Sequence, residues 1–319
     1  MKKWIFILCL TVPVAGTINA QEEEQIVRAI TLEDPVAEMA YNDGITLFNQ
    51  KKFNEALSKF NEAIALNADF DKAYLNRAAT YMELKRMEEA KADYAKAIAL
   101  NPSLSQAYYY RGGILFEQGR YDDAISDYNL AIAHKSDYAF AYNDRAGCYR
   151  SMEKLDKAMD DYNKAISYAS DNATFFSNRG SLKRQMGKIE EAIKDYNEAL
   201  RIDAKNYIVW NNRGLAKFDA EQYQEAIADF SEAVKLKSDY AYAFNNRGIA
   251  KYKMKDYAGA VADFNEAIRI NPKYAYAYLN RGIAKEMLRD PDGACADWQQ
   301  AHEMGVSSAE TYINNSQCK

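Results

Sequence analysis

Hydrophobic and polar positions along this chain recur with one fixed period. A small residue, which we call the marker, begins the pattern, and stepping by 34 from Gly44 lands each time on Gly or Ala: Gly44, Ala78, Gly112, Ala146, Gly180, Gly214, Gly248 and Gly282. Two alanines follow every marker at constant offsets, as Ala56 and Ala63 follow Gly44. Between those two alanines stands a large aromatic residue: Phe60, Tyr94, Tyr128, Tyr162, Tyr196, Phe230, Phe264 and Trp298. A fixed period of this length is the signature of a repeat architecture.

The order small, small, aromatic, small predicts two closely packed antiparallel helices in each repeat. Helices approach closely only where Gly or Ala removes side-chain bulk, and we expect an aromatic ring to fill the resulting gap at the next repeat. Five Pro and 14 Gly in 319 residues, together with abundant Ala, Glu and Lys, favour helices over strands. The pattern therefore predicts an all-α fold.

The period and these residues resemble the tetratricopeptide repeat (TPR) family over residues 37–308. The resemblance implies an α-solenoid, a right-handed superhelix of helix-turn-helix repeats, whose first helix carries the marker. The eight repeats would span 37–70, 71–104, 105–138, 139–172, 173–206, 207–240, 241–274 and 275–308. Such repeats serve as docking surfaces for proteins and peptides and have no chemistry of their own.

The first 20 residues have the character of a secretory signal peptide: two lysines, an apolar run of about 13 residues and a small residue, Ala20, at a cleavage point. An uncleaved anchor is the alternative. Residues 21–36 would form an N-terminal arm of an exported protein, periplasmic or secreted. Without Lys2 and Lys3 the chain has 39 basic and 46 acidic residues, a net charge of −7 that disfavours a nucleic-acid partner.

One column of charge predicts ion pairs. Arginine precedes seven of the markers, and an aspartate follows each arginine at a constant offset, as in Arg213 and Asp229 or Arg247 and Asp263. The first repeat inverts both signs, with Asp43 and Lys59. Because the two inversions occur together, we expect the partners to lie in the same repeat and to fix helix register. A ligand-binding stripe of arginines is the alternative.

The chain ends in a segment that predicts a capping helix over 309–319, which would cover the apolar face of the last repeat. If this helix folds back antiparallel about Val306, Cys318 comes close to Cys295. In an oxidising compartment the two would form a disulfide that closes a loop of about 24 residues. Two free thiols are the alternative, and Cys148 is expected to be a buried thiol.

Enzymatic chemistry is not indicated. The two histidines, His134 and His302, have no nucleophile or ligand set nearby in sequence, and no phosphate-binding loop or metal-spaced cysteines are present. We therefore expect no enzyme activity, no cofactor, no metal and no small-molecule substrate.

A binding site is expected two residues before the marker, because the resemblance implies that this position points into the concave groove. Four successive repeats carry Asn178, Asn212, Asn246 and Asn280 there, and an amide side chain is the complement of a peptide backbone. The flanking groove positions include Phe218, Tyr242, Tyr252 and Tyr276. Asparagine that merely suits the groove wall is the alternative.

The expected function is a scaffold that binds a partner protein or an extended peptide in the cell envelope. The runner-up is a structural component that assembles an envelope complex or self-associates without a peptide in the groove.

Overall fold

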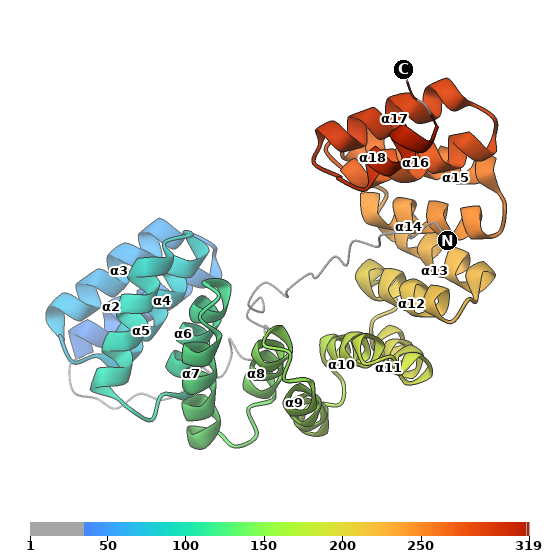
Figure 1. Ribbon diagram of the computed structural model, residues 1–319. Helices are drawn as coiled ribbons and strands as arrows, with labels where there is room; N and C mark the ends of the chain where they lie inside the picture. Colours follow the sequence, from blue (N-terminus) through green and yellow to red (C-terminus); the bar gives the residue numbers. More distant parts are fainter. Residues whose placement is uncertain (1–34, 317, 319) are drawn as a thin grey trace. The chain divides into compact units, whose positions relative to one another are not determined.

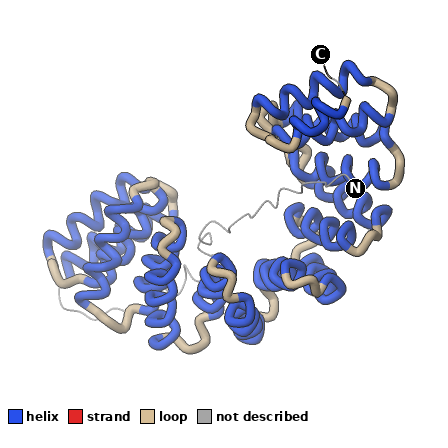
Figure 2. The backbone as a smooth tube through the Cα atoms, viewed as in Figure 1, coloured by secondary structure: helices blue, strands red, loops and turns tan. Residues whose placement is uncertain are grey.

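The computed structural model describes residues 35–316 and residue 318. The predicted signal peptide, and all but the last two residues of the predicted arm, lie outside them. Across the described residues every regular element is a helix, as Figure 2 shows, so the predicted all-α repeat fold is confirmed.

The described chain divides into two compact units, residues 35–170 and residues 171–318. The helices of the N-terminal unit are α2 (Pro35–Asn49), α3 (Phe53–Leu66), α4 (Asp71–Glu83), α5 (Met87–Leu100), α6 (Ser105–Glu117), α7 (Tyr121–His134), α8 (Ala139–Ser151) and α9 (Leu155–Tyr168). Those of the C-terminal unit are α10 (Ala173–Gln185), α11 (Ile189–Ile202), α12 (Tyr207–Asp219), α13 (Tyr223–Leu236), α14 (Ala241–Lys253), α15 (Tyr257–Ile270), α16 (Ala275–Met287), α17 (Pro291–Glu303) and α18 (Ala309–Asn315).

Each repeat is a hairpin of a first helix, which carries the marker, and a second helix that packs against it (Figure 1). The even-numbered helices from α2 to α16 are first helices, and the odd-numbered helices from α3 to α17 are second helices. Within each unit, a second helix also packs against the first helix of the following repeat. The short helix α18 packs on α17 in the place predicted for a cap.

The marker packs against the aromatic residue of its own repeat. A Cβ atom added to Gly44 would lie 2.7 Å from the ring of Phe60, and one added to Gly214 would lie 2.6 Å from the ring of Phe230. Our expectation that the ring fills a gap at the next repeat was therefore wrong. The ring packs between the two helices of one hairpin, and at these two markers even the side chain of alanine would displace it.

The turn within each hairpin needs one residue in the left-handed backbone region. Gly119 and Gly187 supply it in two repeats, with φ of 73° and 76°. The remaining repeats use non-glycine residues, such as Lys85 with φ of 61° and Glu221 with φ of 60°. Because a Cβ atom disfavours this conformation, these repeats carry a small local strain.

Candidate functional site

The predicted binding asparagines divide into two groups. Asn246 and Asn280 are only 3% and 1% exposed. The Asn246 side chain donates a hydrogen bond of 3.0 Å to Oδ1 of Asn211, and that of Asn280 donates one of 3.0 Å to Oδ1 of Asn245. These amides connect neighbouring first helices, α12 to α14 and α14 to α16. They do not have the open, ligand-facing position that we expected, so this part of the prediction is corrected.

Asn178 and Asn212 are partly exposed. They keep the accessibility that a ligand contact requires.

The predicted aromatic positions also have contacts within the fold. The ring of Tyr242 lies edge-on to Tyr240 and Tyr274, with centroids 5.8 and 5.1 Å away. Phe218 packs against Tyr223 at 5.1 Å, and Tyr252 against Tyr257 at 5.2 Å. Phe218 and Tyr252 therefore close the hairpins α12–α13 and α14–α15, and Phe218 is buried. Tyr242, Tyr252 and Tyr276 remain partly exposed.

The predicted ion pairs are present within their repeats. Arg213 donates from Nε and Nη2 to the two carboxylate oxygens of Asp229, at 2.8 and 2.7 Å, and Arg247 binds Asp263 in the same way, at 2.9 and 2.7 Å. The same two-pronged contact joins Arg77 to Asp93, Arg111 to Asp127, Arg145 to Asp161, Arg179 to Asp195 and Arg281 to Asp297. In the first repeat the inverted pair, Lys59 and Asp43, is 3.7 Å apart.

Each arginine also makes contacts other than the ion pair with its aspartate. Arg213 also donates from Nη1 to Oδ1 of Asn197 in the preceding repeat, at 2.7 Å, and its guanidinium lies 4.6 Å from the ring centre of Trp210. One side chain thus joins three helices from two repeats. This engagement speaks against the alternative of a ligand-binding stripe of arginines.

A lysine column, which we did not single out in the sequence, completes the ion pairs of the C-terminal unit. Three residues after each marker stand Lys183, Lys217, Lys251 and Lys285, and each lies 2.9 Å from the aspartate of its repeat. In the N-terminal unit the same position holds Leu47, Tyr81, Leu115 and Tyr149. The recurrence of lysine at one place in four successive repeats was the signal that would have revealed this difference.

Asp144 is a further residue that we missed. It lies on α8, accepts a hydrogen bond of 2.8 Å from the Tyr109 hydroxyl on α6, and accepts another of 2.8 Å from the side chain of Asn143. Loss of solvation raises the pKa of its carboxyl group, and the two hydrogen bonds offset this only in part. In the sequence, Asp144 stands in a column that holds asparagine in six of the eight repeats.

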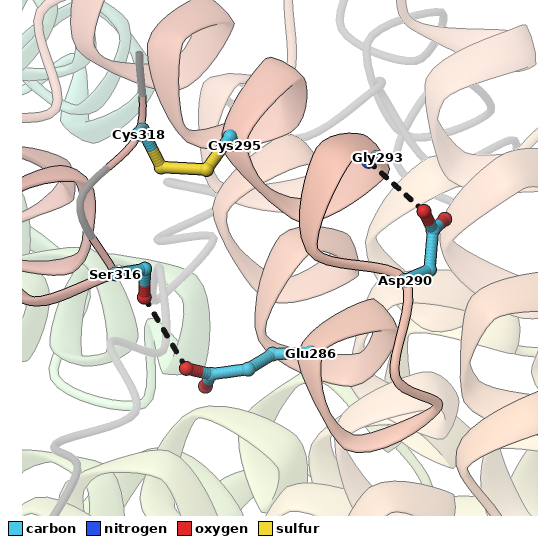
Figure 3. Close-up of a disulfide and its surroundings, with 6 residues drawn as sticks. All are labelled: Glu286, Asp290, Gly293, Cys295, Ser316 and Cys318. Carbon is cyan, nitrogen blue, oxygen red and sulfur yellow. Dashed lines mark hydrogen bonds between the residues drawn. A yellow bond between two sulfur atoms is a disulfide. The ribbon is translucent and has the colours of Figure 1, made fainter.

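The capping helix is fastened at two points, shown in Figure 3. Cys295 on α17 and Cys318 form a disulfide with Cα atoms 5.5 Å apart, which is the pair that the sequence predicted. Nearby, the Ser316 hydroxyl donates to Glu286 at 3.3 Å, and the Asp290 side chain caps α17 by accepting from the backbone of Gly293 at 3.0 Å. Cys148 is a buried free thiol, and burial raises its pKa.

The described residues contain neither a cluster of metal ligands nor a membrane-spanning helix. Within 35–318, no set of three or more His, Cys, Asp or Glu side chains is placed to hold a metal ion. None of the described helices has the length and apolar character needed to cross a bilayer.

Family models agree with the repeat geometry. A model described as TPR repeat matches residues 180–220 and 216–255, and models described as tetratricopeptide repeat match residues 71–104, 88–140, 141–172 and 241–274. The chain belongs to the tetratricopeptide repeat family. Its architecture is that of a protein–protein interaction scaffold. No curated protein matches the chain.

Solved structures share the fold at low sequence identity. The Cut9–Hcn1 hetero-tetramer of the APC/C matches 93% of this chain with a TM-score of 0.64 and 15% identity, and this chain spans 58% of that one. A tetratricopeptide repeat protein from Parabacteroides merdae matches 77% of this chain and 98% of its own, with a TM-score of 0.61 and 18% identity. PilF of Pseudomonas aeruginosa matches 66% of this chain and 96% of its own, with a TM-score of 0.60 and 19% identity.

Proposed function

We propose that this protein is an exported, non-enzymatic scaffold that binds an extended segment of a partner protein along its first helices. The observation that carries the proposal is a set of partly exposed side chains on successive first helices of the C-terminal unit: Ile208, Asn212, Tyr242 and Tyr276. Ile208, Tyr242 and Tyr276 occupy the same position in three successive repeats, and Asn212 lies one turn after Ile208 on α12. An extended chain presents its side chains and backbone groups at regular intervals, which suits such a surface.

The proposed location is the cell envelope. The signal-like segment at residues 1–20 supports export, and the disulfide between Cys295 and Cys318 is of the kind that persists in an oxidising compartment. Mass spectrometry of the protein from the envelope fraction tests this location. We expect a mature chain that begins at Gln21, whereas an intact chain in the cytoplasm would contradict export.

The binding proposal is tested by capture of a partner from the native envelope fraction. The variant Ile208→Ala with Asn212→Ala alters the first helix α12, and Val234→Ala with Gln224→Ala makes a matched change on the second helix α13. We expect the α12 variant to lose capture by about tenfold, since each lost contact contributes roughly 0.5–1.5 kcal/mol. The α13 variant should capture normally.

If the α13 variant loses capture and the α12 variant captures normally, the binding surface lies on the second helices. If the mature protein forms concentration-dependent oligomers in light scattering, and neither variant changes capture, the protein is a self-associating structural component instead.

A further inference from the structure

Asp144 differs from the aspartates of the ion-pair column because it has no basic partner. The seven aspartates of that column are each held by an arginine. Among the described residues, by contrast, no lysine or arginine lies within ion-pair distance of Asp144. Its two hydrogen bonds, from Tyr109 and Asn143, both come from neutral groups. A carboxylate accepts about four hydrogen bonds, so capacity remains for a cation.

The charge is not required for the contact between repeats. In the first two repeats, Asn76 occupies the position of Asp144 and Tyr41 occupies that of Tyr109. The Asn76 side chain donates to the Tyr41 hydroxyl at 3.0 Å. A neutral amide thus makes the same link between neighbouring first helices. The negative charge of Asp144 is therefore an addition that the fold itself does not need.

The position one turn beyond Asp144 carries no side chain. The residue directly after the marker is Gly147 in this repeat and Gly113 in the preceding one, whereas the last three repeats carry Leu215, Ile249 and Ile283 there. Gly147 lies one turn beyond Asp144 on α8, hence on the same side of the helix. A Cβ atom added to Gly147 would meet only the ring of Phe116, at 3.8 and 4.0 Å. At this position α8 therefore presents backbone, with the ring of Phe116 beside it.

Two aromatic rings lie beside these residues. The partly exposed ring of Phe116 is next to Gly147, and the hydroxyl of Tyr109 binds Asp144. Ring faces attract cations, most strongly where water is largely excluded. A carboxylate without a cation, a glycine one turn away and the rings of Tyr109 and Phe116 therefore occur together on α6 and α8.

We propose that Asp144, Tyr109 and Gly147 form a subsite for a lysine or arginine side chain of a partner protein. The inference rests on the proposed function, since it supplies the chemistry of one residue in the bound segment. The basic side chain extends past Gly147 and Phe116, and its charged end contacts the carboxylate of Asp144. The negative charge of the whole chain favours the approach of such a segment.

The test uses ten-residue peptide libraries in which the central residue is Lys, Arg, Gln or norleucine and the other positions are uncharged mixtures. The full mature protein is measured beside Asp144→Asn, which copies Asn76, and beside Gly147→Leu, which copies Leu215. Asp160→Asn removes the same charge from an exposed position on α9 and serves as the control.

We expect the mature protein and the control to retain the Lys and Arg libraries about tenfold better than the Gln and norleucine libraries, a difference of about 1.4 kcal/mol in binding free energy. Asp144→Asn should lose this preference and still bind the norleucine library like the mature protein. Gly147→Leu, which fills the path of the side chain, should bind the Lys, Arg and norleucine libraries more weakly. Binding without basic preference, or a preference that survives in Asp144→Asn, overturns the subsite and leaves the proposed function standing. Failure to retain any library overturns both.

Discussion

The two units are built from the same repeat, yet they use a few positions in opposite ways. In the C-terminal unit each buried aspartate has two cations, an arginine and a lysine, as Asp229 has Arg213 and Lys217. In the N-terminal unit the lysine position holds leucine or tyrosine, and Asp161 has Arg145 alone. The C-terminal unit joins its first helices by paired asparagines, while the N-terminal unit uses tyrosine with Asn76 or Asp144. The C-terminal unit thus gives each aspartate of its ion-pair column two cations. The N-terminal unit gives each of them one, and leaves Asp144 on α8 with neutral partners only.

Loss of one arginine should expose this difference most strongly. Arg145→Met leaves Asp161 buried without a cation, which costs about 3–5 kcal/mol. Arg213→Met should cost clearly less, since Lys217 stays 2.9 Å from Asp229. Urea unfolding followed by hydrogen exchange measures the loss of stability in each unit separately.

Exchanging the charges provides the control for that comparison. Arg145→Asp with Asp161→Arg should recover part of the lost stability, because no third charge stands beside the pair. The same exchange at Arg213 and Asp229 places a new arginine against Lys217, so it should recover little. Equal recovery of stability in both units would show that the lysine column does not affect the ion pairs.

Reduction of the disulfide should affect the C-terminal unit alone. Cys318→Ser opens the link to Cys295 and should lower the free energy of unfolding of the last repeat by about 3 kcal/mol in the chain-entropy model. Hydrogen exchange in residues 35–170 should stay unchanged. A thiol count on denatured mature protein should find one reactive thiol, that of Cys148, and a count of three would contradict the disulfide.

The Asp144→Asn variant brings the N-terminal unit closer to the amide pattern of the other. Because the pKa of Asp144 is raised in the folded protein, the folded state holds this proton more tightly than the unfolded chain does. The free energy of unfolding therefore falls as the pH rises from about 4, where an unfolded aspartate titrates, through the raised pKa. The variant should melt higher than the parent at pH 7, and the gain should vanish below about pH 4.

The titratable neighbours of Asp144 do not interfere with this measurement. Burial raises the pKa of Tyr109, Tyr128 and Cys148, and that of Tyr162 to about 12, so all four stay neutral at pH 7. If the melting temperatures of parent and variant differ by the same amount at pH 4 and pH 7, the carboxyl group is not the cause.

The hairpin turns should show the smallest effect, and the same effect in both units. Lys85→Gly in one unit and Glu221→Gly in the other place glycine where the backbone is left-handed and a Cβ atom is unfavourable. Each should therefore raise the free energy of unfolding of its unit by about 1 kcal/mol. Gly119→Lys should lower the free energy of unfolding by a similar amount. Thermal melts of the three variants check this, and a gain in only one unit would mean that the turns differ in more than their backbone conformation.

Much of the fold was readable from the sequence because its causes lie within one repeat. The period placed the helices, and the joint inversion at Asp43 and Lys59 identified the ion pairs. The antiparallel return about Val306 brought Cys318 to Cys295. These contacts depend on sequence offsets alone.

The side chains between repeats were not readable in the same way. Whether Asn246 faces a ligand or the neighbouring helix depends on how closely two first helices approach, and no sequence offset fixes that distance. Asn212 and Asn246 share one position in the repeat, yet only Asn246 is buried. Asp144 escaped notice because a single acid in a column of amides has no pattern of its own.

The arginine contacts also bear on how such a gene changes length. Arg145, Arg213 and Arg281 each reach an aspartate of their own repeat and an asparagine of the preceding one, at equal separations along the chain. Duplication or deletion of any segment that is one repeat long rejoins an asparagine of one copy to an arginine of the next at the same separation. Unequal crossing-over can therefore lengthen or shorten the array and keep these contacts wherever the rejoined repeat supplies asparagine at this position, which Ala95 and Ser231 do not.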